Sequence, residues 1–165
     1  MELTKNDIAK IEEEISYRKL ELRPELLQNL KTARAQGDLS ENFEYTMAKR
    51  LNNQNNSRVR YLENIVKTAT IIEDTAADDE VGLNKQVTVY VIEDKEEETY
   101  KIVSSIRGNS VEGRISKESP MGMALMGHKA GDVVTIQVNE TYSYDVEIRK
   151  VEPVPDDGAD GLRQY

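Results

Sequence analysis

The sequence contains no cysteine and no tryptophan, and its 165 residues include one phenylalanine and one histidine. Without cysteine the chain has no disulfide framework, no thiolate nucleophile and no cysteine-based zinc site. With His128 as its one histidine, it has little material for histidine-based metal or triad chemistry. No stretch is long and apolar enough to predict a signal peptide or a membrane span. We therefore expect a soluble protein of the cytoplasm that does not enter membranes.

The chain also lacks an excess of positive charge, because its formal net charge is -9. Open electrostatic binding of nucleic acid is disfavoured, since phosphates would be repelled. The charge is divided unevenly along the chain. Residues 1–70 carry 12 Lys/Arg and 11 Asp/Glu, whereas residues 71–165 carry 10 Lys/Arg and 20 Asp/Glu. The two halves therefore have different surfaces and are expected to meet different partners.

The first half contains two stretches with helical periodicity. Apolar residues recur at three- and four-residue steps from Ile8 to Ala33, after Thr4 as an N-cap, and again from about Glu41 to Val66. Gly37 and the short turn after it separate the two stretches. This pattern predicts an antiparallel helical hairpin.

Two features of the hairpin are irregular. Pro24 lies inside the first helix and predicts a kink there, because proline removes a backbone hydrogen bond. The Asn-rich stretch at residues 52–56 favours a solvated, weakly packed part of the second helix. The alternative is a buried asparagine that fixes the register of the two helices.

The second half changes to a period of two. Strands are predicted at residues 86–92, 98–103, 133–138 and 142–148, with a short helix near Pro120–Met126. We expect an α+β chain of two domains: a hairpin over 1–73 with its tip near 37–44, a linker over 74–82 and a β-sheet domain over 83–153. Residues 154–165 are rich in Pro, Asp and Gly and are predicted to be disordered.

Acidic residues are scarce between Leu26 and Leu62, where Asp38, Glu41 and Glu44 are the only ones. An Asp-x-x-Glu pattern at a helix start is most often only a cap. The alternative is that Asp38 and Glu41 hold a divalent cation loosely, because Mg²⁺ takes one or two protein carboxylates and completes its shell from water and phosphate. Such a pair binds the ion well only where another site supplies the missing ligands.

The same span carries six basic residues. Basic residues along a long helix are most often a solvated face, and the alternative is an electrostatic track for an RNA end. The six are Lys31, Arg34, Lys49, Arg50, Arg58 and Arg60.

Two motifs resemble those of the GreA/GreB family of bacterial transcript cleavage factors. Residues 33–45, ARAQGDLSENFEY, are similar to the tip motif A-R-x-x-G-D-x-x-E-N-x-x-Y. Residues 119–132 are similar to the signature S-P-x-x-x-A-L-x-G-x-x-x-G-D. The resemblance implies an N-terminal antiparallel α-helical coiled-coil hairpin followed by an FKBP-like antiparallel β-sheet domain with a short helix.

The resemblance also implies a partner, bacterial RNA polymerase. The coiled coil would enter the secondary channel of the polymerase, and the second domain would dock at the rim of that channel. Asp38 and Glu41 would then be supplied in trans to an Mg²⁺ shared with the polymerase active site, for hydrolysis of the 3′ end of backtracked nascent RNA. The chain would be an accessory factor, not an enzyme, a monomer in solution that binds no metal tightly by itself.

The same resemblance assigns supporting roles. The residues expected to support the tip are Gly37, Asn42, Glu44 and Tyr45, and those expected to dock on the polymerase are Ser119, Pro120 and Met121.

Two other functions stay open at this point. A channel-binding regulator would inhibit transcription without cleavage, and the intact pair of Asp38 and Glu41 disfavours it. A prolyl isomerase or chaperone is suggested only by the FKBP-like domain, and a fold does not give a function. Residues 81–152 contain no Trp or Phe for an aromatic-lined pocket.

Overall fold

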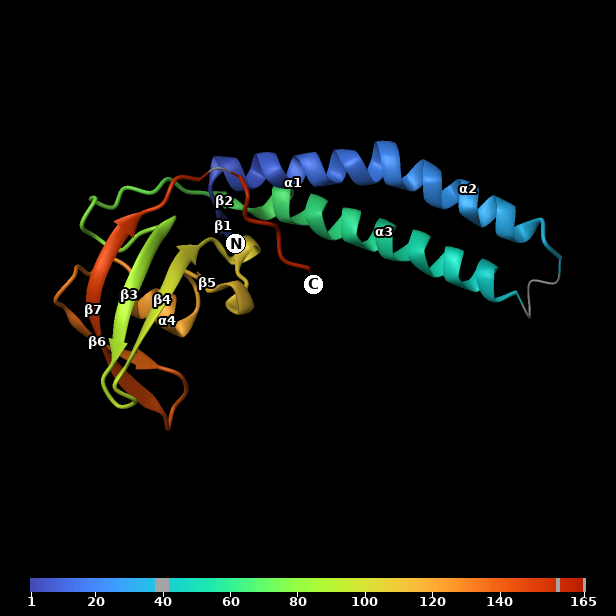
Figure 1. The fold of residues 1–165 in the computed structure, drawn as a ribbon. Helices are drawn as coiled ribbons and strands as arrows, with labels where there is room; N and C mark the ends of the chain where they lie inside the picture. Colours follow the sequence, from blue (N-terminus) through green and yellow to red (C-terminus); the bar gives the residue numbers. More distant parts are fainter. Residues whose placement is uncertain (38–41, 157, 165) are drawn as a thin grey trace. The chain divides into compact units, whose positions relative to one another are not determined.

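The computed structural model describes residues 1–37, 42–156 and 158–164. The chain divides into two compact units, one of residues Ile8–Ala69 and one of Met1–Asp7 together with Thr70–Tyr165. The first is a helical hairpin and the second is a β-sheet domain with a short helix (Figure 1). This confirms the predicted fold class. None of the helices among the described residues is long and apolar enough to span a membrane.

The first arm of the hairpin is a helix with one irregular turn. It consists of α1 (Lys5–Tyr17), the π-helical turn η1 (Arg18–Leu22) and α2 (Arg23–Arg34). The irregular turn directly precedes Pro24, whose nitrogen carries no hydrogen. The Arg23 N–H donates to the Arg18 carbonyl five residues back, so a wider turn takes up the break.

The second arm is α3 (Phe43–Thr68), which begins two residues after the predicted start. The reason is Asn42, whose backbone is extended (φ -86°, ψ 95°) and whose side chain caps the helix. Asparagine is among the favoured N-cap residues because its short side chain accepts from an orphan N–H of the first turn.

The middle of the hairpin is held by a buried polar layer. Asn55 is 3% exposed; its Oδ1 accepts from Arg18 at 3.1 Å, and its Nδ2 donates to the Arg18 carbonyl at 3.2 Å. Arg58 is 2% exposed, and its Nε lies 2.9 Å from Oε1 of Glu14. The preference for a solvated Asn-rich stretch is therefore wrong at Asn55, whereas Asn53 and Gln54 are exposed.

The β-sheet domain is a five-stranded sheet in the order β5-β4-β3-β7-β6. Its elements are β3 (Lys85–Val91), β4 (Glu96–Val103), β5 (Arg114–Ser116), β6 (Val133–Gln137), β7 (Ser143–Pro153) and the helix α4 (Pro120–Leu125). The pairs are antiparallel except β4 with β5, which is parallel. The sequence predicted an antiparallel sheet, but the sheet is mixed. The difference is the short strand β5, which was not predicted and which pairs in parallel with β4.

The core of this domain lies on the face of the sheet that α4 covers. Val87, Val89 and Val91 alternate along β3 with more exposed residues, as a half-buried strand requires, and are at most 5% exposed. Leu125 of α4 belongs to the same cluster. Burial of one such side chain stabilises the fold by about 1.5–3 kcal/mol.

Both chain ends are fastened to this unit. The short strands β1 (Glu2–Leu3) and β2 (Thr70–Ile71) pair in parallel. The residues after Pro153, for which the sequence predicts disorder, have no regular secondary structure where they are described. They nevertheless carry Asp156 and Asp160, which form ion pairs with the body of the domain.

The polar layer generates the first prediction. Glu14→Gln leaves the Arg58 cation buried without its counter-charge, so we expect the free energy of unfolding to fall by about 3 kcal/mol. Burial opposes ionisation of Glu14, but hydrogen bonds from Arg58 and Arg18 outweigh it and lower the pKa of Glu14. The contribution is thus complete above the unfolded-state pKa and is lost as the pH falls through the lowered value. Urea unfolding at several pH values measures both effects, and the exposed Glu13→Gln is the matched control.

Candidate functional site at the tip end of the hairpin

The two carboxylates predicted to act on a metal, Asp38 and Glu41, lie outside the described residues. Their role therefore stays a prediction. Gly37, the last described residue before them, has φ +117°. An added Cβ there would meet nothing within 4 Å. Glycine is therefore favoured at this position by backbone conformation and not by lack of space.

The side chain of Asn42 joins the two helices beside the tip segment. Asn42 accepts through Oδ1 from the Tyr45 N–H at 3.0 Å and donates through Nδ2 to the Ala33 carbonyl at 2.8 Å. The first bond satisfies an orphan donor at the start of α3, and the second serves a carbonyl in the last turn of α2. Asn42 thus fixes the separation of the helix ends where the tip segment leaves and returns.

Arg34 and Tyr45 form a second contact between the helix ends. The Arg34 guanidinium lies 5.7 Å from the centroid of the Tyr45 ring, within the range of a cation–π interaction. A hydrogen bond with Arg34 lowers the pKa of the Tyr45 phenol against a smaller opposing effect of burial, and the charge of Arg34 adds to the lowering. The pair keeps one cation beside the hairpin end.

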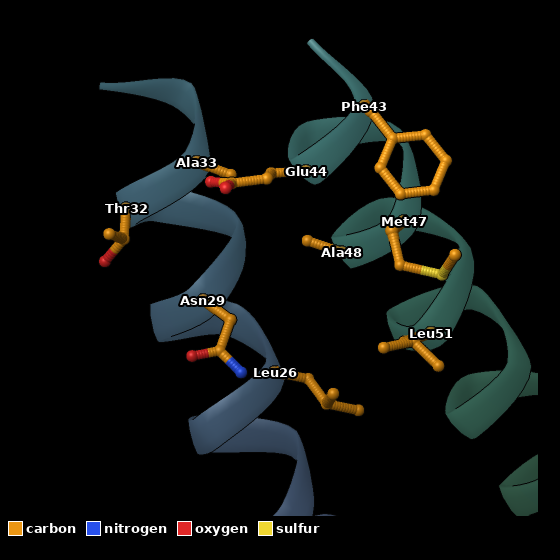
Figure 2. Close-up of a pocket in the computed structure, with 9 residues that line it drawn as sticks. All are labelled: Leu26, Asn29, Thr32, Ala33, Phe43, Glu44, Met47, Ala48 and Leu51. Atoms are coloured by element: carbon orange, nitrogen blue, oxygen red, sulfur yellow. The ribbon is translucent and has the colours of Figure 1, made fainter. Parts of the chain in front are cut away.

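Next to these contacts α2 and α3 border an open groove of about 350 Å³. Phe43 and Met47 on its α3 side are 73% and 37% exposed, which is unusual for apolar side chains of this size. Figure 2 shows Glu44 reaching from α3 toward Ala33 of α2. The lining residues are Leu26, Asn29, Thr32, Ala33, Phe43, Glu44, Met47, Ala48 and Leu51.

Five of the six predicted RNA-contacting residues are exposed on the helix surfaces. They are Lys31, Arg34, Lys49, Arg50 and Arg60. Lys49 and Arg50 line a shallow depression together with Ser57, whose Oγ accepts from Arg60 at 3.2 Å.

Arg58 is the exception among the six. It is 2% exposed and paired with Glu14, so the structure contradicts its prediction as an RNA contact. No local pattern could predict this burial, because the partner Glu14 is 44 residues away in the sequence.

No group of three or more potential metal ligands occurs among residues 1–37, 42–156 and 158–164. The predicted pair outside this range offers two carboxylates, which is the donor chemistry that Mg²⁺ prefers but too few ligands for its octahedral shell. The donor set therefore fits an ion that is shared with another macromolecule.

In the β-sheet domain the predicted docking residues lie at the start of α4. Ser119 caps this helix, since its Oγ accepts from the Gly122 N–H at 3.0 Å, and it donates to the Ser116 carbonyl at 2.7 Å. Pro120 is exposed, whereas Met121 packs partly against the core. A Cβ on Gly122 would lie 2.1 Å from the Ser116 carbonyl oxygen, so α4 approaches this backbone closely.

The loop before Ser119 has support that the sequence did not predict. The Ser105 hydroxyl bonds to the Ser116 hydroxyl at 2.7 Å and donates to the Glu118 carboxylate at 2.6 Å. The bond from Ser105 lowers the pKa of Glu118 despite partial burial. Serines separated by 11 residues carry no local signal for such a pair.

These features define a class: a helical-hairpin factor whose helix ends are joined through Asn42, followed by a small mixed-sheet domain. Two protein-family models match the chain. That of the transcription elongation factor N-terminal domain matches residues 1–71, and that of the GreA/GreB C-terminal domain matches residues 76–153. The chain therefore belongs to the GreA/GreB family of transcription elongation factors, as the sequence motifs predicted.

Two curated relatives agree with this assignment. Transcription elongation factor GreA of Streptococcus gordonii is 41% identical over 151 residues, which are 91% of this chain and 94% of that protein. GreA of Streptococcus pneumoniae serotype 19F is 42% identical over the same shares. The crystal structure of Gfh1 of Thermus thermophilus covers 92% of this chain and 98% of that chain, at 23% identity and a TM-score of 0.42.

The two bonds of Asn42 generate a prediction about the hairpin end. Asn42→Ala removes the cap of α3 and the bond to α2, so we expect a loss of about 1–2 kcal/mol in the free energy of unfolding. Asn42→Asp retains the acceptor and loses the donor, and its cost should be smaller. Thermal unfolding followed by circular dichroism measures both. Asn53→Ala, an exposed change inside α3, is the control and should cost nothing; an equal effect of Asn42→Ala would contradict the bridging role.

Proposed function

We propose that this chain inserts the tip end of its hairpin into the secondary channel of bacterial RNA polymerase and stimulates Mg²⁺-dependent hydrolysis of backtracked RNA 3′ ends, which rescues arrested complexes. The observation that carries the proposal is the bridge made by Asn42 between α2 and α3 beside the acidic tip segment. Such a bridge restricts the points from which Asp38 and Glu41 are presented. The partners are the polymerase and its nascent RNA, and the compartment is the cytoplasm.

In this proposal the chain completes a site that belongs to the polymerase. Asp38 and Glu41 supply carboxylate oxygens to a cation that the polymerase and the RNA phosphate also hold. Bound there, Mg²⁺ would activate water and stabilise the charge that develops on the phosphate. The two carboxylates can act only when the hairpin is bound in the channel, so the role of the hairpin is to position them. Positioning of reacting groups alone can lower the activation free energy of a reaction substantially.

The exposed cations beside the tip have a complementary task. Lys49 and Arg50 lie on the surface of α3, where they attract RNA phosphates. The first half of the chain is close to neutral although the whole chain is acidic. A near-neutral arm with local cations meets less repulsion from nucleic acid than the second half would.

The rest of the chain supports docking of the factor. Ser119 and Pro120 present the start of α4 to the rim of the channel, and the bonds of Ser105 hold the preceding loop. Docking by this domain would leave the hairpin free to act inside the channel.

The acidic pair generates the central prediction. Asp38→Asn/Glu41→Gln should abolish RNA cleavage in stalled, backtracked complexes with 3′-labelled RNA, because the amides are poor Mg²⁺ ligands. Binding to the polymerase should be retained, since Asn and Gln have nearly the same size and shape as Asp and Glu.

The matched control is Glu93→Gln/Glu140→Gln, which removes the same charge from turns of the β-sheet domain. Its cleavage activity should equal that of the parent chain. Undiminished cleavage by the Asp38/Glu41 variant would refute the proposal. Binding of the parent chain without any cleavage, with inhibition of multi-round transcription, would instead identify a channel-blocking regulator.

The exposed cations generate a separate prediction. Lys49→Gln/Arg50→Gln should raise the factor concentration needed for half-maximal cleavage by about tenfold at low salt, and the difference should shrink as salt rises. The control is Lys67→Gln, which removes a cation from the far end of α3. A difference that does not depend on salt would exclude an electrostatic role for this pair.

A further inference from the structure

Two cations lie directly opposite one another at the edge of the β-sheet. Lys101 of β4 is the register partner of Arg114 of β5. Like charges in directly opposed positions destabilise a sheet. Both side chains are mostly covered, with 17% and 12% of their surface exposed, so water screens them little. This arrangement calls for an anion between them.

The C-terminal segment supplies that anion. One carboxylate oxygen of Asp160 lies 2.5 Å from Nζ of Lys101, and the other lies 3.5 Å from Nη1 of Arg114. Arg114 also pairs with Glu112 and donates through Nε to the Arg107 carbonyl at 2.9 Å. Asp160 therefore bridges Lys101 and Arg114, two cations on neighbouring strands that would otherwise repel each other.

A second carboxylate of the segment, that of Asp156, contacts a buried cation. Asp156 lies four residues before Asp160. Arg107 is 3% exposed and pairs with Asp7, and its Nη1 donates to Asp156 at 2.8 Å. Burial opposes ionisation of Asp156, but hydrogen bonds from Arg107 and Asn6 lower its pKa. The contact therefore persists at neutral pH and is lost as the pH falls through the lowered pKa.

A backbone hydrogen bond also links the described part of the segment to the domain. The Arg163 N–H donates to the Ile106 carbonyl at 2.7 Å, whereas Gly158, Ala159 and Gly161 are exposed. The red trace in Figure 1 leaves β7 and runs beside the part of the chain that holds η2 (Ser105–Arg107) and η3 (Ser110–Glu112). A pocket of about 760 Å³ lies between the segment and this part of the domain. The ion pairs of Asp156 and Asp160 are therefore the main charged contacts described for the segment.

We propose that Lys101, Arg107 and Arg114 form a binding site for an acidic peptide with two carboxylates four residues apart, and that residues 154–165 are its resident, exchangeable ligand. The match to the family model covers residues 76–153, so the three cations lie inside it and the proposed ligand segment lies beyond it. Exchange is expected because the described part of the segment has no regular secondary structure and is held by ion pairs whose carboxylates, those of Asp156 and Asp160, stay partly exposed to water. The site goes beyond the proposed function and does not depend on it.

The test uses the full chain with its own ligand neutralised. A fluorescent peptide of residues 154–165 is added to the Asp156→Asn/Asp160→Asn variant, and binding is followed by anisotropy. The variant should bind the peptide at least about tenfold more tightly than the parent chain, whose tethered segment competes at an effective concentration in the millimolar range. The peptide with both Asp→Asn changes should not bind.

Two further variants separate the site from a general effect of charge. Glu93→Gln/Glu140→Gln removes the same charge elsewhere and should bind the peptide as weakly as the parent chain. Addition of Lys101→Gln/Arg114→Gln to the tail-neutralised chain should abolish binding. Equal binding by the parent and tail-neutralised chains, or none by the latter, would overturn the proposal.

Hydrogen exchange keeps the test decisive if the double change at Asp156 and Asp160 disturbs folding. Asp160→Asn alone leaves both ion pairs of Arg107 intact. In this variant the Arg163 amide should lose protection while the amides of β3 keep theirs. Unchanged protection of Arg163 would show that Asp160 does not hold the segment and would refute the proposal.

Discussion

The register of the two hairpin helices depends on one buried ion pair, that of Glu14 with Arg58. The apolar seam includes Ile11, Val59 and Leu62, which are at most 2% exposed, and loss of one buried methyl group from such packing costs about 0.5–1.5 kcal/mol. A sliding step of one residue would move α3 by about 1.5 Å along α2 and separate the two charges. Because the cost of an unpaired buried charge far exceeds that of a lost methyl contact, the pair selects one register.

The contacts at the tip end rely on that selection. Asn42 reaches the Ala33 carbonyl, and Arg34 reaches the Tyr45 ring, only when the two helices end at matching heights. The π-helical turn before Pro24 lies beside the same polar layer, where Asn55 takes the carbonyl of Arg18 as an acceptor. A proline that interrupts the helix is therefore accommodated where side-chain polar groups already replace apolar packing.

Much of this arrangement could be predicted from the sequence, and the failures have two physical causes: partners that are distant in sequence and elements too short to show a pattern. Periodicity predicted both arms and most of the sheet, and Pro24 predicted an irregularity in the first arm. These features depend on neighbours within a few residues. The burial of Arg58 depends on a partner 44 residues away, and the tail contact of Lys101 on one 59 residues away. Strand β5 has three residues, too few for an alternating pattern to stand out. For the tip, the sequence identified Asn42 but could not show that its side chain serves both helices.

Buried or half-buried ion pairs organise both units, yet their consequences differ. Removal of charges from water costs about as much as their attraction returns, so such pairs add little net stability and act mainly by excluding alternatives. Glu14 and Arg58 lie on helices that are joined at one end, so neither can leave without unfolding of the hairpin. Asp160 lies on a terminal segment without regular secondary structure where it is described, so it can separate from Lys101 while the sheet stays intact. The same interaction therefore locks a register in one unit and holds an exchangeable ligand in the other.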